Sequence, residues 1–169
     1  MKKILFGCLA FSMLTIISCK KTAKVDGGTF TFKGTTYNVN SAIGNTTGDN
    51  AVVAISQPSN QYNQLQFTFF SDIEGGAQVF HYPTAGNYTV VRDAPTDSTQ
   101  VQVNLQFTTG STYDNTMFRP DSITNILATV VVLGGKLNIT LPSLNLKNKA
   151  DTTDVGSLTA TIKQTSDTQ

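Results

Sequence analysis

Apolar and polar residues alternate along most of the chain from Thr29 onward. This two-residue period is typical of β-strands that have one buried face and one solvent-exposed face. Between residues 101 and 107, valine, leucine and phenylalanine alternate with glutamine and asparagine, which is the longest regular stretch. The pattern predicts half-buried strands at residues 29–32, 64–69, 101–107, 137–141 and 158–162.

Two further runs, 51–55 and 126–133, are continuously apolar and favour central strands buried on both faces. Glycine-bearing breaks predict hairpin turns at residues 33–34, between strands at 29–32 and 35–40, at residues 83–86, between strands at 78–82 and 87–91, and at residues 134–135. No stretch has the period of a capped helix. We therefore predict one all-β domain at residues 29–169, with nine or ten strands in an antiparallel β-sandwich. A β-barrel is the alternative. The longest predicted loop covers residues 110–122.

The first nineteen residues have the features of an export signal. A positive start is followed by an uncharged stretch at residues 4–17, which is too short to span a bilayer as a helix. Residues 16–19, Ile-Ile-Ser-Cys, then resemble the lipobox of bacterial lipoproteins. The resemblance implies that residues 1–18 are a signal peptide, that Cys19 carries the lipid and that residues 19–28 are a tether. The alternative is an ordinary secretory signal that leaves Cys19 as a free thiol.

The residue after the lipobox bears on location. Lys20 stands where an aspartate would resemble the inner-membrane retention signal of enteric bacteria, so the outer membrane is the predicted address. No acidic run that resembles a surface-export signal follows Cys19, which favours the periplasmic leaflet. Cys8 leaves with the signal peptide, and the mature domain therefore has no intramolecular disulfide.

Composition and charge exclude several classes of function. Only 14% of the 169 residues are charged, against roughly 25% in an average domain, and the chain has 1 His and 0 Trp. From residue 29 onward there are 7 basic and 10 acidic residues, a net charge of −3. Such a domain offers no basic surface for nucleic acid. No cofactor is predicted.

Catalytic and metal-binding chemistry has few candidates. His81 is the sole imidazole, and no G-x-S-x-G motif accompanies it. Asp72 and Glu74 would share a face on a strand, as paired carboxylates do in glycoside hydrolysis, but the sequence around them favours a turn. The aspartates lack the spacing of a calcium loop. We predict no enzyme activity and no metal site, and an Asp-dependent hydrolase is the least favoured alternative.

Amide side chains recur on the wet faces of two predicted strands, 64–69 and 101–107. If these strands are neighbours, they bring together Gln64, Gln66, Gln102, Asn104 and Gln106. Each amide group both donates and accepts hydrogen bonds, which suits sugar hydroxyls when an aromatic face lies nearby. The tyrosines that would supply a ring are Tyr62, Tyr82, Tyr88 and Tyr113, of which Tyr82 is our candidate. The alternative is a solvated sheet face without a ligand.

Three short segments are similar to the D-[ST]-[AILVMT] sequon for O-glycosylation of exported proteins in some Gram-negative lineages. They are Asp97-Ser98-Thr99, Asp121-Ser122-Ile123 and Asp151-Thr152-Thr153. All three fall in or beside predicted loops, and the similarity implies glycans on Ser98, Ser122 and Thr152. The alternative is coincidence, because threonine occurs 26 times and is the commonest residue.

Hairpin segments at residues 29–39, 83–90 and 134–141 resemble those of uncharacterised small all-β lipoproteins from Gram-negative bacteria that specialise in polysaccharides. The resemblance implies an antiparallel sandwich on a lipid anchor and brings no established activity. We predict a non-enzymatic, lipid-anchored envelope protein that binds a glycan or a protein partner. The alternatives are a structural or accessory subunit without a small ligand and a lipocalin-like carrier, although the G-x-W motif of lipocalins is missing.

Overall fold

The computed structural model describes residues 26–45, 51–57, 61–75, 77–80, 82–109 and 114–167. These residues form fourteen β-strands, which confirms the all-β prediction. Within them, no helix is long and apolar enough to cross a membrane. Cys19 and the tether lie outside the described residues.

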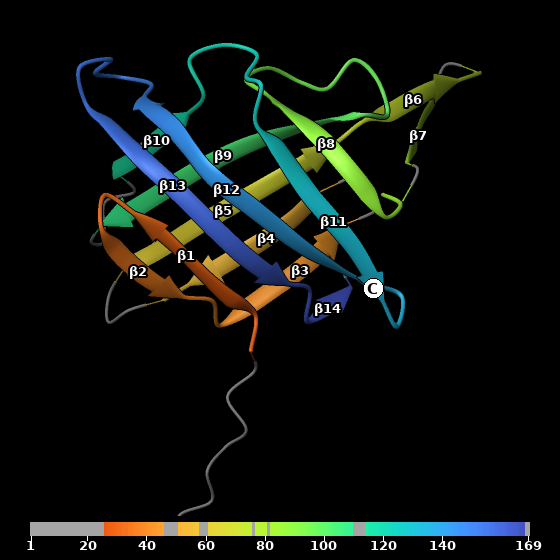
Figure 1. The fold of residues 1–169 in the computed structure, drawn as a ribbon, viewed down its shortest axis with the longest axis horizontal. Coiled ribbons are helices and arrows are strands. Elements are labelled where there is room, and N and C mark those ends of the chain that lie inside the picture. Colours follow the sequence, from red (N-terminus) through yellow and green to blue (C-terminus); the bar gives the residue numbers. More distant parts are fainter. Residues whose placement is uncertain are drawn as a thin grey trace, which may run out of the picture.

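Twelve of the strands belong to one large sheet, which folds over so that two layers face each other (Figure 1). In the front layer of that view the strand order is β8-β11-β12-β13-β1-β2, and every pair in it is antiparallel. The bounds of these strands are β8 (Gly86–Val91), β11 (Leu127–Leu133), β12 (Lys136–Asn148), β13 (Val155–Lys163), β1 (Gly28–Phe32) and β2 (Thr35–Asn38).

The back layer crosses behind the front one in the order β14-β3-β4-β5-β9. Its strands are β14 (Ser166–Asp167), β3 (Ser41–Asn45), β4 (Ala51–Ser56), β5 (Gln61–Phe69) and β9 (Gln100–Thr109). β9 pairs in parallel with β8 and β14 pairs in parallel with β3, so the sheet is mixed, although most of its pairs are antiparallel. A separate hairpin consists of β6 (Ser71–Glu74) and β7 (Ala77–Phe80).

The two layers are joined at two places. The β8–β9 pair forms one junction, and β10 (Asp114–Arg119), which pairs with both β9 and β12, forms the other. The sheet therefore closes into a ring only in part, because the strand order still begins at β14 and ends at β2. The predicted two-layer arrangement, and not the alternative barrel, describes this architecture.

Four described strands have no counterpart in the sequence prediction: β3, β6, β10 and β14. β10 lies inside residues 110–122, which we expected to be a loop. It is a strand because its backbone pairs with β9 on one side and β12 on the other. β12 runs on past Pro142, where the register with β13 shifts between Leu141 and Leu144. Such a bulge tolerates proline, which has no N–H for the ladder.

The core lies between the layers and is built from the inward residues of both. Phe32 of the front layer stacks on Phe107 of the back layer, with ring centroids 5.7 Å apart. Phe69 of the back layer meets the edge of Tyr88 of the front layer at 5.1 Å. The largest fully buried side chains are Phe30, Phe67, Leu65, Leu105, Leu137, Ile139, Leu141, Leu144, Leu146, Leu158, Ile162 and Val39.

The prediction that residues 126–133 are buried on both faces is wrong. Ala128 and Val130 point into the core, but Leu127, Val131 and Leu133 are 45%, 44% and 62% exposed. β11 is an inner strand of its layer, yet none of the described strands forms a further layer over its outer face. A continuous apolar run therefore did not distinguish a strand covered on both faces from one covered on a single face.

Four aspartates have hydrogen-bond or ionic partners that lower their pKa values. The pKa of Asp154 is below its ordinary value because Lys33 and then Asn148 donate hydrogen bonds to the carboxylate. The salt bridge to Lys33 links the β1–β2 turn to the segment between β12 and β13. The other three aspartates with a lowered pKa are Asp93, Asp97 and Asp151.

We expect the protein to lose stability in acid. A carboxylate whose pKa is lowered in the folded state stabilises the fold above its unfolded pKa of about 4, and this contribution disappears as the pH falls through the folded value. Unfolding temperatures measured from about pH 6 to about pH 2 should therefore decline on the acid side. An Asp154→Asn variant should be less stable than the wild type at neutral pH and should approach it in acid. Parallel curves would contradict this expectation.

Candidate functional site

The two amide-bearing strands are direct neighbours, as the candidate site requires. β5 pairs with β9, and the register places Gln64 opposite Gln106, Gln66 opposite Asn104, and Thr68 opposite Gln102. Directly opposed residues in antiparallel strands point to the same face. All six side chains therefore lie on the outer face of the back layer, where each is half-buried. We call these three opposed pairs the amide ladder.

Several groups of the amide ladder are available for a ligand. Gln66 donates to the Thr68 hydroxyl at 3.1 Å, and Gln102 donates to the backbone carbonyl of Arg92 at 2.8 Å. The amides of Gln64, Asn104 and Gln106 make no hydrogen bond within the described ranges. Because each of these amides has both donors and acceptors, the ladder presents complementary groups to a hydroxyl-rich molecule.

The strands of the back layer that carry the amide ladder, and the two strands next to it on the β4 side, are uncharged. The four strands β3, β4, β5 and β9 contain no charged residue at all. On the β4 side the ladder is flanked by Val53 and Ile55, which lie opposite Gln66 and Gln64. Tyr62 lies opposite Thr108 at the end of the ladder and is 36% exposed. The face thus combines amides, aliphatic groups and one tyrosine ring, whereas β10, the strand paired with β9 on its other side, carries Asp114 and Arg119.

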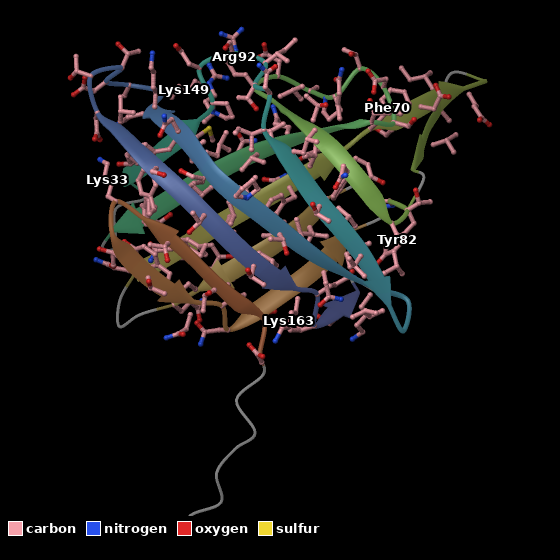
Figure 2. The ribbon with its side chains drawn as sticks, viewed as in Figure 1. Lys33, Phe70, Tyr82, Arg92, Lys149 and Lys163 are labelled. Carbon is pink, nitrogen blue, oxygen red and sulfur yellow. The ribbon has the colours of Figure 1, made fainter. Side chains whose placement is uncertain are left out.

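Tyr82, our aromatic candidate, is not on this face. Its hydroxyl donates to the Gln164 side-chain oxygen at 2.6 Å and approaches the Gly135 carbonyl at 3.2 Å, near the β11–β12 turn (Figure 2). Tyr88 is buried, and its hydroxyl donates to the Thr84 carbonyl at 2.8 Å. Tyr113 lies outside the described residues. Among the described tyrosines, Tyr62 is therefore the one that the fold places beside the amide ladder.

The three sequons lie in loops at one end of the molecule. Ser98, Ser122 and Thr152 are all exposed and follow β8, β10 and β12, at the end where Arg92 and Lys149 are labelled in Figure 2. The described chain begins at the other end, where Asp26 forms an ion pair with Lys163 at 2.6 Å. The candidate modification sites therefore lie at the end of the molecule opposite to the start of the described chain.

Two of the sequon loops have the same local structure. Asp97 Oδ1 accepts hydrogen bonds from the backbone N–H and the hydroxyl of Thr99, at 2.8 and 2.5 Å. Asp151 Oδ1 accepts the same pair from Thr153, at 3.0 and 2.7 Å. These threonine side-chain bonds are the main reason that the pKa values of both aspartates are lowered. The residue between aspartate and threonine is left exposed at the turn.

The residues considered for catalysis do not come together in the part of the chain that the structure describes. Asp72 and Glu74 are exposed on β6. Of these two carboxylates, Asp72 lines a hollow of about 300 Å³, together with Phe70 and Tyr82, and Glu74 does not. His81 lies outside the described residues. Among the residues that the structure describes, no three histidine, cysteine, aspartate or glutamate side chains come together as a metal site.

Sequence reasoning missed the polar residues that the fold buries. Gln164 is 5% exposed, and its side-chain oxygen accepts from Tyr82 and from the Leu137 N–H, so its role is structural. Asn63 and Ser56 are 1% and 3% exposed and lie opposite each other on β5 and β4. The two-residue alternation in β5 could have revealed the burial of Asn63. This residue occupies the same inward series of positions as Leu65 and Phe67.

Comparisons with family models, with curated proteins and with solved structures find nothing that matches this chain, so its function has to be inferred from the residues and their arrangement.

Proposed function

We propose that the protein is a lipid-anchored envelope protein that binds a neutral glycan on the amide ladder and catalyses no reaction. The observation that carries the proposal is the register of β5 and β9, which sets five amide side chains and Thr68 side by side on two strands that contain no charged residue. The lipobox-like residues 16–19 support the anchor. Lys20 and the lack of an acidic run after Cys19 support attachment to the outer membrane with the domain in the periplasm.

The geometry of a β-sheet suits an extended sugar chain. Opposed side chains on neighbouring strands are roughly 5 Å apart, and successive outward residues on one strand are about 7 Å apart. Hydroxyl groups recur at a similar spacing along a polysaccharide, so several amides can engage one chain. Tyr62 at the end of the ladder supplies a ring face for a sugar. The absence of charge from β3, β4, β5 and β9 favours a neutral glycan over an acidic one.

A glycan array probed with the full chain tests the proposal, and its strongest ligand is then titrated against variants. An Asn104→Ala/Gln106→Ala double variant should bind roughly tenfold more weakly, because each lost hydrogen bond contributes about 0.5–1.5 kcal/mol. The matched control is Asn138→Ala/Asn145→Ala, which removes two amides from β12 in the other layer. An array without any bound glycan, or equal weakening by both double variants, would refute the proposal.

O-linked glycans on Ser98, Ser122 and Thr152 are the second part of the proposal. All three side chains are exposed, and their loops lie at the end away from the start of the described chain. Modification there would leave the opposite end, where the described chain begins, uncovered. Intact-mass measurement of the native chain, with a Ser98→Ala/Ser122→Ala/Thr152→Ala variant as control, should show added hexose units in the native chain alone. A native mass equal to that of the unmodified polypeptide would contradict this part.

A further inference from the structure

The last residues of β11 are aliphatic on both faces of the strand. Val131 and Leu133 point outward and are exposed, and Val132, on the core side, is still 36% exposed. We call these three residues the β11 patch. A cluster of exposed aliphatic side chains is a common mark of a contact surface, and none of the described strands covers the outer face here.

The β11 patch ends in an uncharged turn that is held against the body of the molecule. Gly134 and Gly135 form this turn, and both have a positive φ. The Tyr82 hydroxyl approaches the Gly135 carbonyl at 3.2 Å and donates to the buried Gln164 at 2.6 Å. These contacts fix the position of the turn, and of the β11 patch beside it, on the domain.

The β11 patch lies at the end of the molecule where the described chain begins (Figure 1). A row of opposed residues crosses the sheet from Val130 through Ile139 and Ile162 to Gly28. This row spans three strand spacings of about 4.8 Å, or about 14 Å. Three antiparallel pairings separate β11 from β1, so β11 runs on to its patch on the same side of the row as the chain that precedes Gly28.

The sequence that precedes this end indicates what covers the β11 patch. Residues 19–25 contain Lys20, Lys21 and Lys24 and no acidic residue. Seven residues span at most about 25 Å, even when they are fully extended. A lipid on Cys19 would therefore hold this end of the domain within about 25 Å of a bilayer. The three lysines carry the charge that anionic head groups attract.

We propose that the β11 patch is a membrane contact, whose aliphatic side chains enter the interface of a phospholipid bilayer that contains anionic lipid. Burial of aliphatic groups in the acyl region is favourable because it removes them from water. The inference rests on the lipid anchor of the proposed function and adds to it the orientation of the domain. In this orientation the three sequon loops point away from the bilayer.

Charged side chains beside the β11 patch have partners within the protein. Lys163 forms its ion pair with Asp26, and Lys136 donates from Nζ to the Thr165 carbonyl. Lys136 lies opposite Leu133, at the turn itself. Because these charges are already paired, the approach of the patch to the bilayer does not isolate a charge from all its partners.

The chain has no tryptophan, so a single introduced indole is a unique fluorescent reporter. The full chain with Leu133→Trp is reconstituted into vesicles of phosphatidylethanolamine and phosphatidylglycerol. Its emission should shift to the blue, and lipids brominated on their acyl chains should quench it. The matched control is Leu127→Trp, on the same face of the same strand but about 20 Å away, which should keep the emission of an indole in water and escape quenching.

Hydrogen exchange of the unsubstituted chain gives a second readout that does not depend on a tryptophan. The backbone amides of Gly134 and Gly135 should exchange more slowly on vesicles than in a Cys19→Ala chain free in solution, because the bilayer excludes water from the turn. The amides of residues 121–123, at the opposite end of the molecule, should exchange equally fast in both samples.

Intact mass and sedimentation with the vesicles, read on the same samples, separate failure of the contact from failure of the anchor. If the mass shows lipid on Cys19 and the two reporters are quenched alike or not at all, the contact is overturned and the anchor stands. A blue shift of the Leu133→Trp chain that disappears when the protein is diluted in lipid would assign the β11 patch to a second copy and also overturn the contact. A chain that carries no lipid and stays off the vesicles would refute the anchor and the contact together.

Discussion

Replacing Gly28 by alanine is expected to destabilise the fold by about 2–5 kcal/mol. Gly28 has a φ of +88°, a conformation that costs a residue with a Cβ about 1–2 kcal/mol. An added Cβ would also fall on the backbone carbonyl of Thr161, inside any permitted contact distance. Because this clash is with backbone, the β1–β13 pair has to move, and overpacking of this kind costs about 1–3 kcal/mol. Denaturant unfolding of the variant measures the loss.

Gly34→Ala is the matched control for this prediction. Gly34 has a similar φ of +77°, in the turn between β1 and β2, but an added Cβ there meets nothing within 4 Å. Its expected loss is the strain alone, about 1–2 kcal/mol. Gly28→Ala should therefore be clearly less stable than Gly34→Ala. Equal losses would show that the contact with Thr161 relaxes without cost.

Replacing Cys19 by alanine is expected to abolish lipid attachment. If residues 16–19 form a lipobox, the variant has no thiol for the diacylglyceryl group. Each buried CH₂ of an acyl chain contributes about 0.8 kcal/mol to membrane binding, so two chains make the anchor stable and their loss removes it. Metabolic labelling with an alkyne fatty acid, read on the purified chain, should give full signal for the wild type and none for Cys19→Ala.

Cys8→Ala provides the control for the anchor, because Cys8 lies in the predicted signal peptide and leaves with it. This variant should be labelled as strongly as the wild type. Intact mass adds a second readout, since the wild type should begin at residue 19 and carry lipid. An unlabelled wild type, or a labelled Cys19→Ala variant, would overturn the lipoprotein prediction and leave the ordinary secretory signal as the explanation.

The strands that the sequence predicted are those whose own residues alternate over a sufficient length. β1, β5, β9 and β13 all lie where the two-residue period indicated them. β3, β6, β10 and β14 have two to six residues each, and their residues do not alternate between apolar and polar. β10 in particular exists because β9 and β12 provide hydrogen-bonding edges on both sides, and no local pattern encodes those edges.

The candidate site was predictable in part for the same reason. The alternation placed Gln64, Gln66 and Gln102 on wet faces, and their strands proved to be neighbours in the register that opposes the amides. Tyr82 was assigned to the site from its residue type alone, and its contact with Gln164 places it elsewhere. Asn63 was missed because an asparagine beside glutamines suggests a polar surface unless its position in the period is counted.

The sequence by itself determined the local properties of this protein. Alternation decides which side of a strand faces the core, whatever its neighbours are, and glycine permits the positive φ of the turns at residues 34 and 134–135. The scarcity of charge and the lipobox-like segment are likewise readable without a structure. Only the tertiary structure decided which strands pair, how one sheet folds into two layers and why Asn63 is buried. Backbone hydrogen bonds are nearly the same for every pair of strands, so the order of strands depends on how all the buried faces pack together.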